Sequence, residues 1–163
     1  HNYEYLTLVW VWWRNQQIVN AIAPQIEAGD IVVGHSNGGM IAFLLAQLGV
    51  PMQGLVLINP ALASDVKFPD HVGWVHVYHN EGDTVLDLLK PFAPCPWGNM
   101  GKIGYRGEDP KVTSFNGNAC KAPLHGHSDY FAEGKLSMGG QLQVKNVLHQ
   151  IEASGDFRCG QTV

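Results

Sequence analysis

The sequence predicts an α/β fold: a three-layer α/β/α sandwich around a mostly parallel sheet of about five or six strands. Three observations support this prediction. Strand-like and helix-like segments alternate along the chain, hydrophobic residues make up 45% of it and charged residues 15%, and its length is 163 residues. A low charge content is typical of strands covered on both faces. The length suits one core, so we expect a single domain over residues 1–163.

Five short segments rich in β-branched and aromatic residues predict strands. They cover residues 5–12, 31–34, 55–59, 74–78 and 112–115. Because helical patterns separate them, right-handed crossovers should bring the carboxyl ends of the strands to one edge of the sheet. A binding or catalytic site is expected at that edge.

Three segments have the periodicity of helices. Residues 18–26 carry one apolar stripe, although Pro24 should kink or divide this helix. Residues 40–48 are apolar on nearly all sides, which predicts a buried helix. Residues 144–151 repeat apolar side chains at positions i, i+3, i+4 and i+7, which predicts a last helix.

Residues 86–110 interrupt this alternation with four prolines and four glycines. A loop of this length is usually functional, so we place it near the site. Its aromatic residues Phe92, Trp97 and Tyr105 could either roof the site or anchor the loop to the surface, and the sequence leaves both readings open.

Composition excludes several classes of partner. The net charge is −4 with only ten Lys and Arg residues, so we expect no nucleic-acid partner. The longest apolar stretch, residues 6–13, is far shorter than the roughly 20 residues that cross a bilayer, so no membrane span is expected. Cys95, Cys120 and Cys159 lack the spacing of metal ligands. Their odd number leaves at least one unpaired within a monomer, and a Cys95–Cys120 bridge stays open for an oxidising compartment.

The strongest motif is Gly-His-Ser-Asn-Gly-Gly at residues 34–39, between an apolar strand and an apolar helix. This context is typical of a nucleophile elbow, a sharp turn that lifts a serine hydroxyl above the sheet. Small residues two before and two after the serine keep the turn free of clashes. The turn also places Ser36 at a helix N-terminus, where free N–H groups favour developing negative charge.

With this motif and the following Leu-Val-Leu-Ile-Asn-Pro at residues 55–60, the sequence resembles the α/β-hydrolase family, specifically its small lipases and esterases. The likeness runs from about residue 29 to the C-terminus. The family usually has about three further strands before this point, so the resemblance implies a reduced, N-terminally shortened fold. It also implies hydrolysis of a small-molecule acyl ester with no metal and no organic cofactor.

The resemblance supplies a catalytic triad in the chain order serine, acid, histidine. Ser36 is the nucleophile, Asp83 matches the acid after the next-but-one strand, and His127 matches the histidine after the last strand. His127 would move the proton while Asp83 orients its ring. Three rivals remain open: Glu81 and Asp87 for the acid, and His125 for the histidine.

For the oxyanion hole, the first expected donor is the backbone N–H of Asn37. The family often supplies the second donor from a His-Gly pair, which does not precede Ser36 here. If the strand over residues 5–12 lies beside the nucleophile strand, its exit loop could supply the N–H of Trp13 or Arg14. The alternative is that this strand is peripheral.

Trp12, His35 and Trp97 are predicted to contact the substrate. Packing in the core is an equally good reading of Trp10, Trp12 and Trp13. A metal site built from His71, His76, His79, His125 and His127 is disfavoured, because His76 alternates with valines on a strand and no His-Glu-x-x-His motif occurs. Amide or thioester cleavage would use the same machinery as ester cleavage. The competing class is a non-catalytic hydrolase-fold protein with a structural or interaction role.

Overall fold

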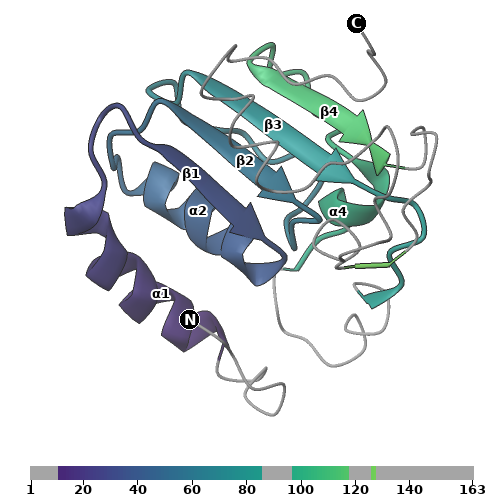
Figure 1. Ribbon diagram of the computed structural model, residues 1–163, viewed down its shortest axis with the longest axis horizontal. Helices are drawn as coiled ribbons and strands as arrows, with labels where there is room; N and C mark the ends of the chain where they lie inside the picture. The colour runs from purple at the N-terminus through teal and green to yellow at the C-terminus, as the bar shows by residue number, and fades with distance from the viewer. Residues whose placement is uncertain (1–10, 86–96, 118–125, 128–163) are drawn as a thin grey trace, which may run out of the picture.

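The computed structural model describes residues 11–85, 97–117 and 126–127 of the chain. Within them, four parallel strands form one sheet in the order β1-β2-β3-β4 (Figure 1). The strands are β1 Ile31–His35, β2 Gly54–Ile58, β3 Trp74–His79 and β4 Val112–Asn116. The predicted α/β class with a parallel sheet is therefore confirmed, and four of the five predicted strands lie within one residue of their predicted bounds.

The register aligns the carboxyl ends of the strands. His35 pairs with Ile58, Ile58 with Tyr78, and His79 with Asn116. Two backbone hydrogen bonds extend the ladder past the strand ends, from the N–H of Ser36 to the Ile58 carbonyl at 3.0 Å and from the N–H of Asn59 to the Tyr78 carbonyl at 2.8 Å. The residues that follow β1, β2 and β3 are therefore held side by side at one edge.

Two longer helices support the first strands. α2 Asn37–Gln47 packs against β1 and β2, and α1 Val11–Ile22 packs against α2 (Figure 1). Seven residues of α2 are buried, which confirms the predicted buried helix. The 3-10 turn η2 Ala23–Gln25 contains Pro24 and directly follows α1, so the proline divides the helical segment as predicted. The short helix α4 Met100–Ile103 contacts β3.

The predicted strand over residues 5–12 is wrong where it can be compared, because Val11 and Trp12 belong to α1. Residues 5–10 lie outside the described part. The local content of valine and tryptophan favours a strand, but burial on one helical face decides the outcome: Asn15 and Val19, four residues apart, are 1% and 0% exposed. Packing against α2 thus overrides the local propensity.

Two other expectations change or go untested. The segment 86–110 was expected to be loop, yet it includes the helix α4. Residues 86–96 and the predicted last helix at residues 144–151 lie outside the described residues.

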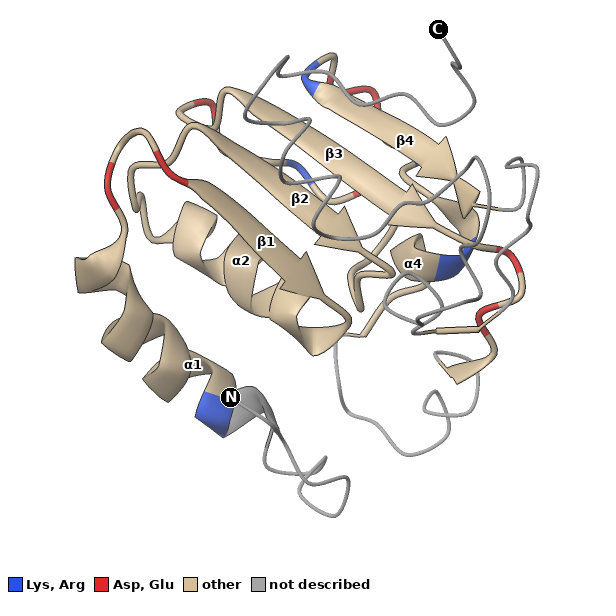
Figure 2. Cartoon of the chain, in the orientation of Figure 1, with Lys and Arg blue, Asp and Glu red and all other residues tan. Residues whose placement is uncertain are grey.

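The core lies between the sheet and its helices. β2 is buried along its whole length, and Phe43 from α2 meets Phe68 edge-on with ring centroids 5.5 Å apart. None of the four strands contains a charged residue, so the charges gather in loops and helices (Figure 2). No helix among the described residues is both long and apolar enough to cross a bilayer.

The close approach of β1 and α2 requires glycine at two positions of the motif. A methyl group at Gly34 would collide with the backbone of Gly38, and one at Gly39 would lie 2.8 Å from Cβ of Pro60. Gly38 has open space around the position of a Cβ atom. On the helix side of the turn, the steric requirement therefore falls on Gly39 rather than on Gly38.

We predict that Gly34→Ala lowers the free energy of unfolding by about 1–3 kcal/mol, because its methyl group meets backbone that cannot move aside. Gly38→Ala is the matched control and should leave stability unchanged or slightly raised, since alanine favours helix. Urea denaturation of both variants measures this. Equal stability of the two variants would contradict the geometry described for the turn.

Candidate active site

Ser36 occupies a strained turn between β1 and α2. Its φ and ψ angles are 54° and −120°, a conformation that residues other than glycine rarely adopt. The backbone holds it in place, because the Ser36 carbonyl accepts hydrogen bonds from the N–H groups of Gly39 at 3.0 Å and Ala61 at 3.1 Å. The serine thus stands at the N-terminus of α2, as the motif predicts.

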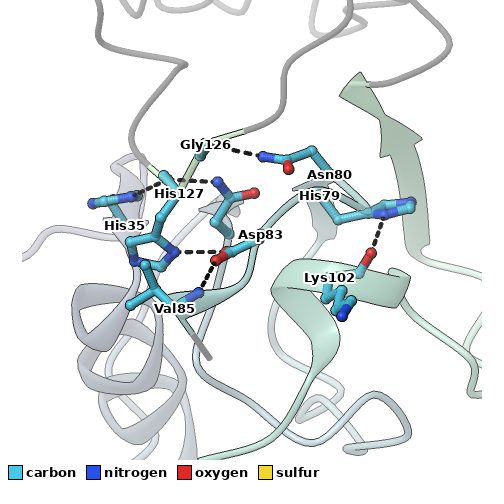
Figure 3. A network of polar contacts seen from close by, with 9 residues as sticks. His35, His79, Asn80, Asp83, Val85, Lys102, Gly126 and His127 are labelled. Atoms are coloured by element: carbon cyan, nitrogen blue, oxygen red, sulfur yellow. Dashed lines mark hydrogen bonds and ion pairs between the residues drawn. The ribbon is translucent and has the colours of Figure 1, made fainter. Parts of the chain in front are cut away.

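Asp83 and His127 form a short polar contact beside this turn. Asp83 Oδ2 lies 2.6 Å from His127 Nδ1, and the second oxygen, Oδ1, accepts the N–H of Val85 at 3.1 Å (Figure 3). The Asp83 side chain is fully buried, and that of His127 is 12% exposed. Among the described residues Asp83 is the only buried carboxylate. Because Nδ1–H donates to the carboxylate, Nε2 of His127 is left as the nitrogen that can take a proton.

The rivals of these two residues are placed differently. Glu81 is exposed and accepts a hydrogen bond from Nδ2 of Asn116 at 2.9 Å, so it points to β4 rather than to His127. Asp87 and His125 lie outside the described residues. The structure therefore brings together Asp83 and His127, and it does not bring Glu81 to this pair.

His127 also lies against the residue that precedes the serine. The rings of His35 and His127 have centroids 4.9 Å apart, at an interplanar angle of 46°. No hydrogen bond joins the Ser36 hydroxyl to another described residue. Catalytic hydrogen bonds are often long in free enzymes and tighten only when substrate binds, so this geometry is compatible with a Ser36–His127 pair.

Three side chains at the strand ends bind the main chain at His127. Nε2 of His35 lies 3.0 Å from the His127 carbonyl, Nδ2 of Asn59 donates to the same oxygen at 2.6 Å, and Nδ2 of Asn80 donates to the Gly126 carbonyl at 3.1 Å. The sequence analysis predicts that His35 contacts the substrate, but it does not single out Asn59 and Asn80. These two residues could have been found from their positions, since each directly follows an apolar strand.

A pair of amide side chains joins α1 to the serine turn. Asn15 and Asn37 exchange hydrogen bonds between their side chains, at 2.9 Å from Asn15 Nδ2 to Asn37 Oδ1 and 2.8 Å from Asn37 Nδ2 to Asn15 Oδ1. Asn15 is 1% exposed. The pair fixes the side chain of the residue whose backbone N–H is the expected first oxyanion donor. No sequence pattern identifies Asn15 as the partner of Asn37, because the two residues are 22 positions apart and lie on different helices.

The expected source of the second oxyanion donor needs correction. Trp12, Trp13 and Arg14 do not form an exit loop but belong to the first turn of α1. Donation by Trp13 therefore stays a prediction, now from a helix rather than a loop, and substrate contact by Trp12 stays a prediction as well.

Two of the other aromatic residues considered in the sequence pack against the core. Trp97 and Tyr105 are partly buried and pack against the hydrophobic core, and Tyr105 lies 6.1 Å from Phe68 between ring centroids. For Tyr105 this favours anchoring over roofing, while substrate contact by Trp97 stays a prediction. Phe92 and all three cysteines lie outside the described residues.

Two histidines of the disfavoured metal site, His76 and His79, contact other groups. His76 contacts the rings of Trp74 and Phe115, with centroids 4.6 Å and 5.3 Å away, and His79 Nδ1 donates to the Lys102 carbonyl at 3.2 Å. Over residues 11–85, 97–117 and 126–127, no group of three or more His, Cys, Asp or Glu side chains is arranged to hold a metal ion.

No protein-family model matches this sequence, and a search of curated proteins finds no significant relative.

Burial lowers the pKa of two histidines near the sheet edge. Desolvation is the largest cause and brings the pKa of His35 and of His79 below the ordinary value of 6.5, although hydrogen bonds to the carbonyls of His127 and Lys102 oppose it. Both rings are therefore neutral in the folded protein at pH 7. In that state, Nε2–H of His35 donates to the His127 carbonyl.

We predict that the free energy of unfolding falls as the pH drops below 6.5. In this range the unfolded chain binds protons at positions 35 and 79 that the folded protein excludes, so acid favours unfolding. The double variant His35→Gln, His79→Asn replaces each bonded ring N–H with an amide N–H and removes both titrations. Urea denaturation between pH 5 and pH 8 should give a flatter stability profile for this variant, and profiles of equal slope would contradict the prediction.

Proposed function

We propose that this protein is a serine hydrolase that cleaves a carboxylic ester, or a related acyl bond, through Ser36, His127 and Asp83. One observation carries the proposal: a fully buried carboxylate is bonded to an imidazole at the same sheet edge where a serine is held at positive φ. A buried carboxylate is destabilising unless paired, and this one is paired with a ring whose other nitrogen is free to act as a base.

The proposed mechanism is acyl transfer in two steps. His127 Nε2 takes the proton of the Ser36 hydroxyl while Oγ attacks the acyl carbon. The oxyanion that forms accepts a hydrogen bond from the backbone N–H of Asn37, and the N–H of Trp13 in α1 is the proposed second donor. His127 then returns the proton to the leaving alcohol. In the second step, His127 Nε2 takes a proton from a water molecule that attacks the acyl carbon, and it gives this proton to Ser36 Oγ as the acid leaves. Asp83 keeps the imidazole in one tautomer and stabilises the imidazolium.

The proposal extends to the fold. We assign a reduced α/β-hydrolase architecture, a three-layer α/β/α sandwich with about five or six strands. Four parallel strands, the helix α2 directly after the serine, and the chain order Ser36, Asp83, His127 support this assignment. The substrate is a small-molecule acyl ester, and neither a metal nor an organic cofactor takes part in the steps above.

We predict that a fluorophosphonate probe labels the protein at Ser36 and that short p-nitrophenyl esters are hydrolysed. Ser36→Ala should abolish labelling and lower kcat/KM by about 10⁴-fold or more, because no other group replaces the nucleophile. Ser64→Ala is the matched control and should leave both readouts unchanged. Labelling that survives Ser36→Ala contradicts the proposal, and folded protein that neither labels nor turns over favours a non-catalytic hydrolase-fold protein.

We also predict that Asp83→Asn lowers kcat by about 10⁴-fold, since an amide cannot hold His127 in the required tautomer. Glu81→Gln, two residues away on the exposed side of the same loop, should retain nearly full activity. Steady-state kinetics on both variants distinguishes the two acids, and a larger loss in Glu81→Gln would assign the acid to Glu81.

A further inference from the structure

Three side-chain donors at the carboxyl ends of neighbouring strands converge on two consecutive carbonyl groups. His35 ends β1, and Asn59 and Asn80 directly follow β2 and β3. His35 and Asn59 contact the His127 carbonyl at 3.0 Å and 2.6 Å, and Asn80 contacts the Gly126 carbonyl at 3.1 Å. Figure 3 shows His35 and Asn80 reaching Gly126 and His127 from opposite sides. Each donor comes from a different strand, so the parallel register sets their spacing.

Packing alone does not account for amides at positions 59 and 80. Both side chains belong to residues that are 0% exposed, and within the described part of the chain the Oδ1 atom of each is buried without a hydrogen-bond partner. An unpaired buried acceptor is destabilising, and an apolar residue would avoid it. What an apolar residue would lose is the Nδ2–H donor, and in both residues this donor binds the main chain of the segment that carries His127.

The backbone at Asn59 is strained at the same place. Asn59 has a φ of 41°, and only Ser36 shares a positive φ among the non-glycine residues that the structure describes. Asparagine tolerates this conformation better than most side chains. The N–H of Asn59 is held by the Tyr78 carbonyl at 2.8 Å, and Gly101 packs so closely that an added methyl group would lie 2.8 Å from Cα of Asn59. The strain is therefore fixed by β3 and α4.

We propose that His35, Asn59 and Asn80 are positioning residues that hold the main chain at residues 126–127, so that the His127 ring stays bonded to Asp83 and faces the serine turn. This inference rests on the proposed function for its catalytic consequence. Two side-chain donors bind the main-chain carbonyl of His127, and the Asp83 carboxylate binds its ring. Loss of a side-chain donor to these carbonyl groups lets the His127 ring move out of the geometry that proton transfer needs.

The test replaces the donors without changing the size of the side chain. Asn59→Asp tolerates the positive φ but places a carboxylate oxygen against the His127 carbonyl, and Asn80→Asp does the same to Gly126. Each should lower kcat for p-nitrophenyl acetate by about 100-fold with KM changed less than about threefold, because a misplaced catalytic group affects the chemical step. The exposed Asn20→Asp on α1 is the matched control and should change neither constant.

His35 provides a rescue experiment in case the buried variants fold poorly. His35→Gln retains an N–H near the position of Nε2, whereas His35→Leu does not, so the glutamine variant should keep at least about tenfold more activity than the leucine variant. Equal activities, with both proteins folded by circular dichroism, would overturn the role assigned to His35. A loss explained wholly by a smaller folded fraction, with unchanged kcat per folded molecule, would overturn the role of Asn59 and Asn80.

Proton NMR separates this inference from the proposed function. The Nδ1 proton of His127 in the 2.6 Å contact with Asp83 should give a low-field signal in wild type and in Ser36→Ala. That signal should be lost or shifted upfield in Asn59→Asp and Asn80→Asp. If wild type shows no hydrolysis but the signal responds in this way, the positioning inference stands and the proposed function fails. An unchanged signal in both variants overturns the inference.

Discussion

The structure of the site depends on the hydrogen bond between Asp83 and His127. A fully buried carboxylate lies far from the water that would solvate it, and each of its oxygens therefore needs a donor. The N–H of Val85 supplies one and the imidazole of His127 the other. Since the partners are 44 residues apart in sequence, this contact also joins the segment after β4 to the loop after β3. Loss of either partner would leave an uncompensated polar group in the interior.

The parallel sheet supplies the geometry in which this bond is useful. Because the register aligns the ends of β1, β2 and β3, residues 35, 59 and 80 meet at one edge and can bind one short piece of main chain. Among the described residues, the two non-glycine residues with positive φ, Ser36 and Asn59, lie at this same edge. Backbone strain concentrated beside a buried carboxylate is typical of functional sites, where surrounding structure holds conformations that are locally unfavourable.

The sequence predictions are accurate where an element depends on residues close together in the chain, and they fail where it depends on contacts between distant residues. β2 and β3 were predicted within a residue because their β-branched runs match burial on both faces of a sheet. The glycine at position 34 was predicted from the sharpness of the turn, and the collision of an added methyl group with Gly38 explains it. The prediction of a strand over residues 5–12 is wrong at Val11 and Trp12, because these two residues favour a strand locally, whereas burial of Asn15 and Val19 against α2 favours a helix.

The sequence by itself determined the alternation of strands and helices and the serine turn, because these follow from local periodicity and one short motif. Only the tertiary structure decided that Asp83 rather than Glu81 meets His127, that Asn15 pairs with Asn37, and that His35, Asn59 and Asn80 grip residues 126–127. The physical reason is that a single polar residue forms no periodic pattern or motif from which its hydrogen-bond partner could be predicted. Its partner is set by strand register and helix packing, which bring distant parts of the chain within hydrogen-bonding distance.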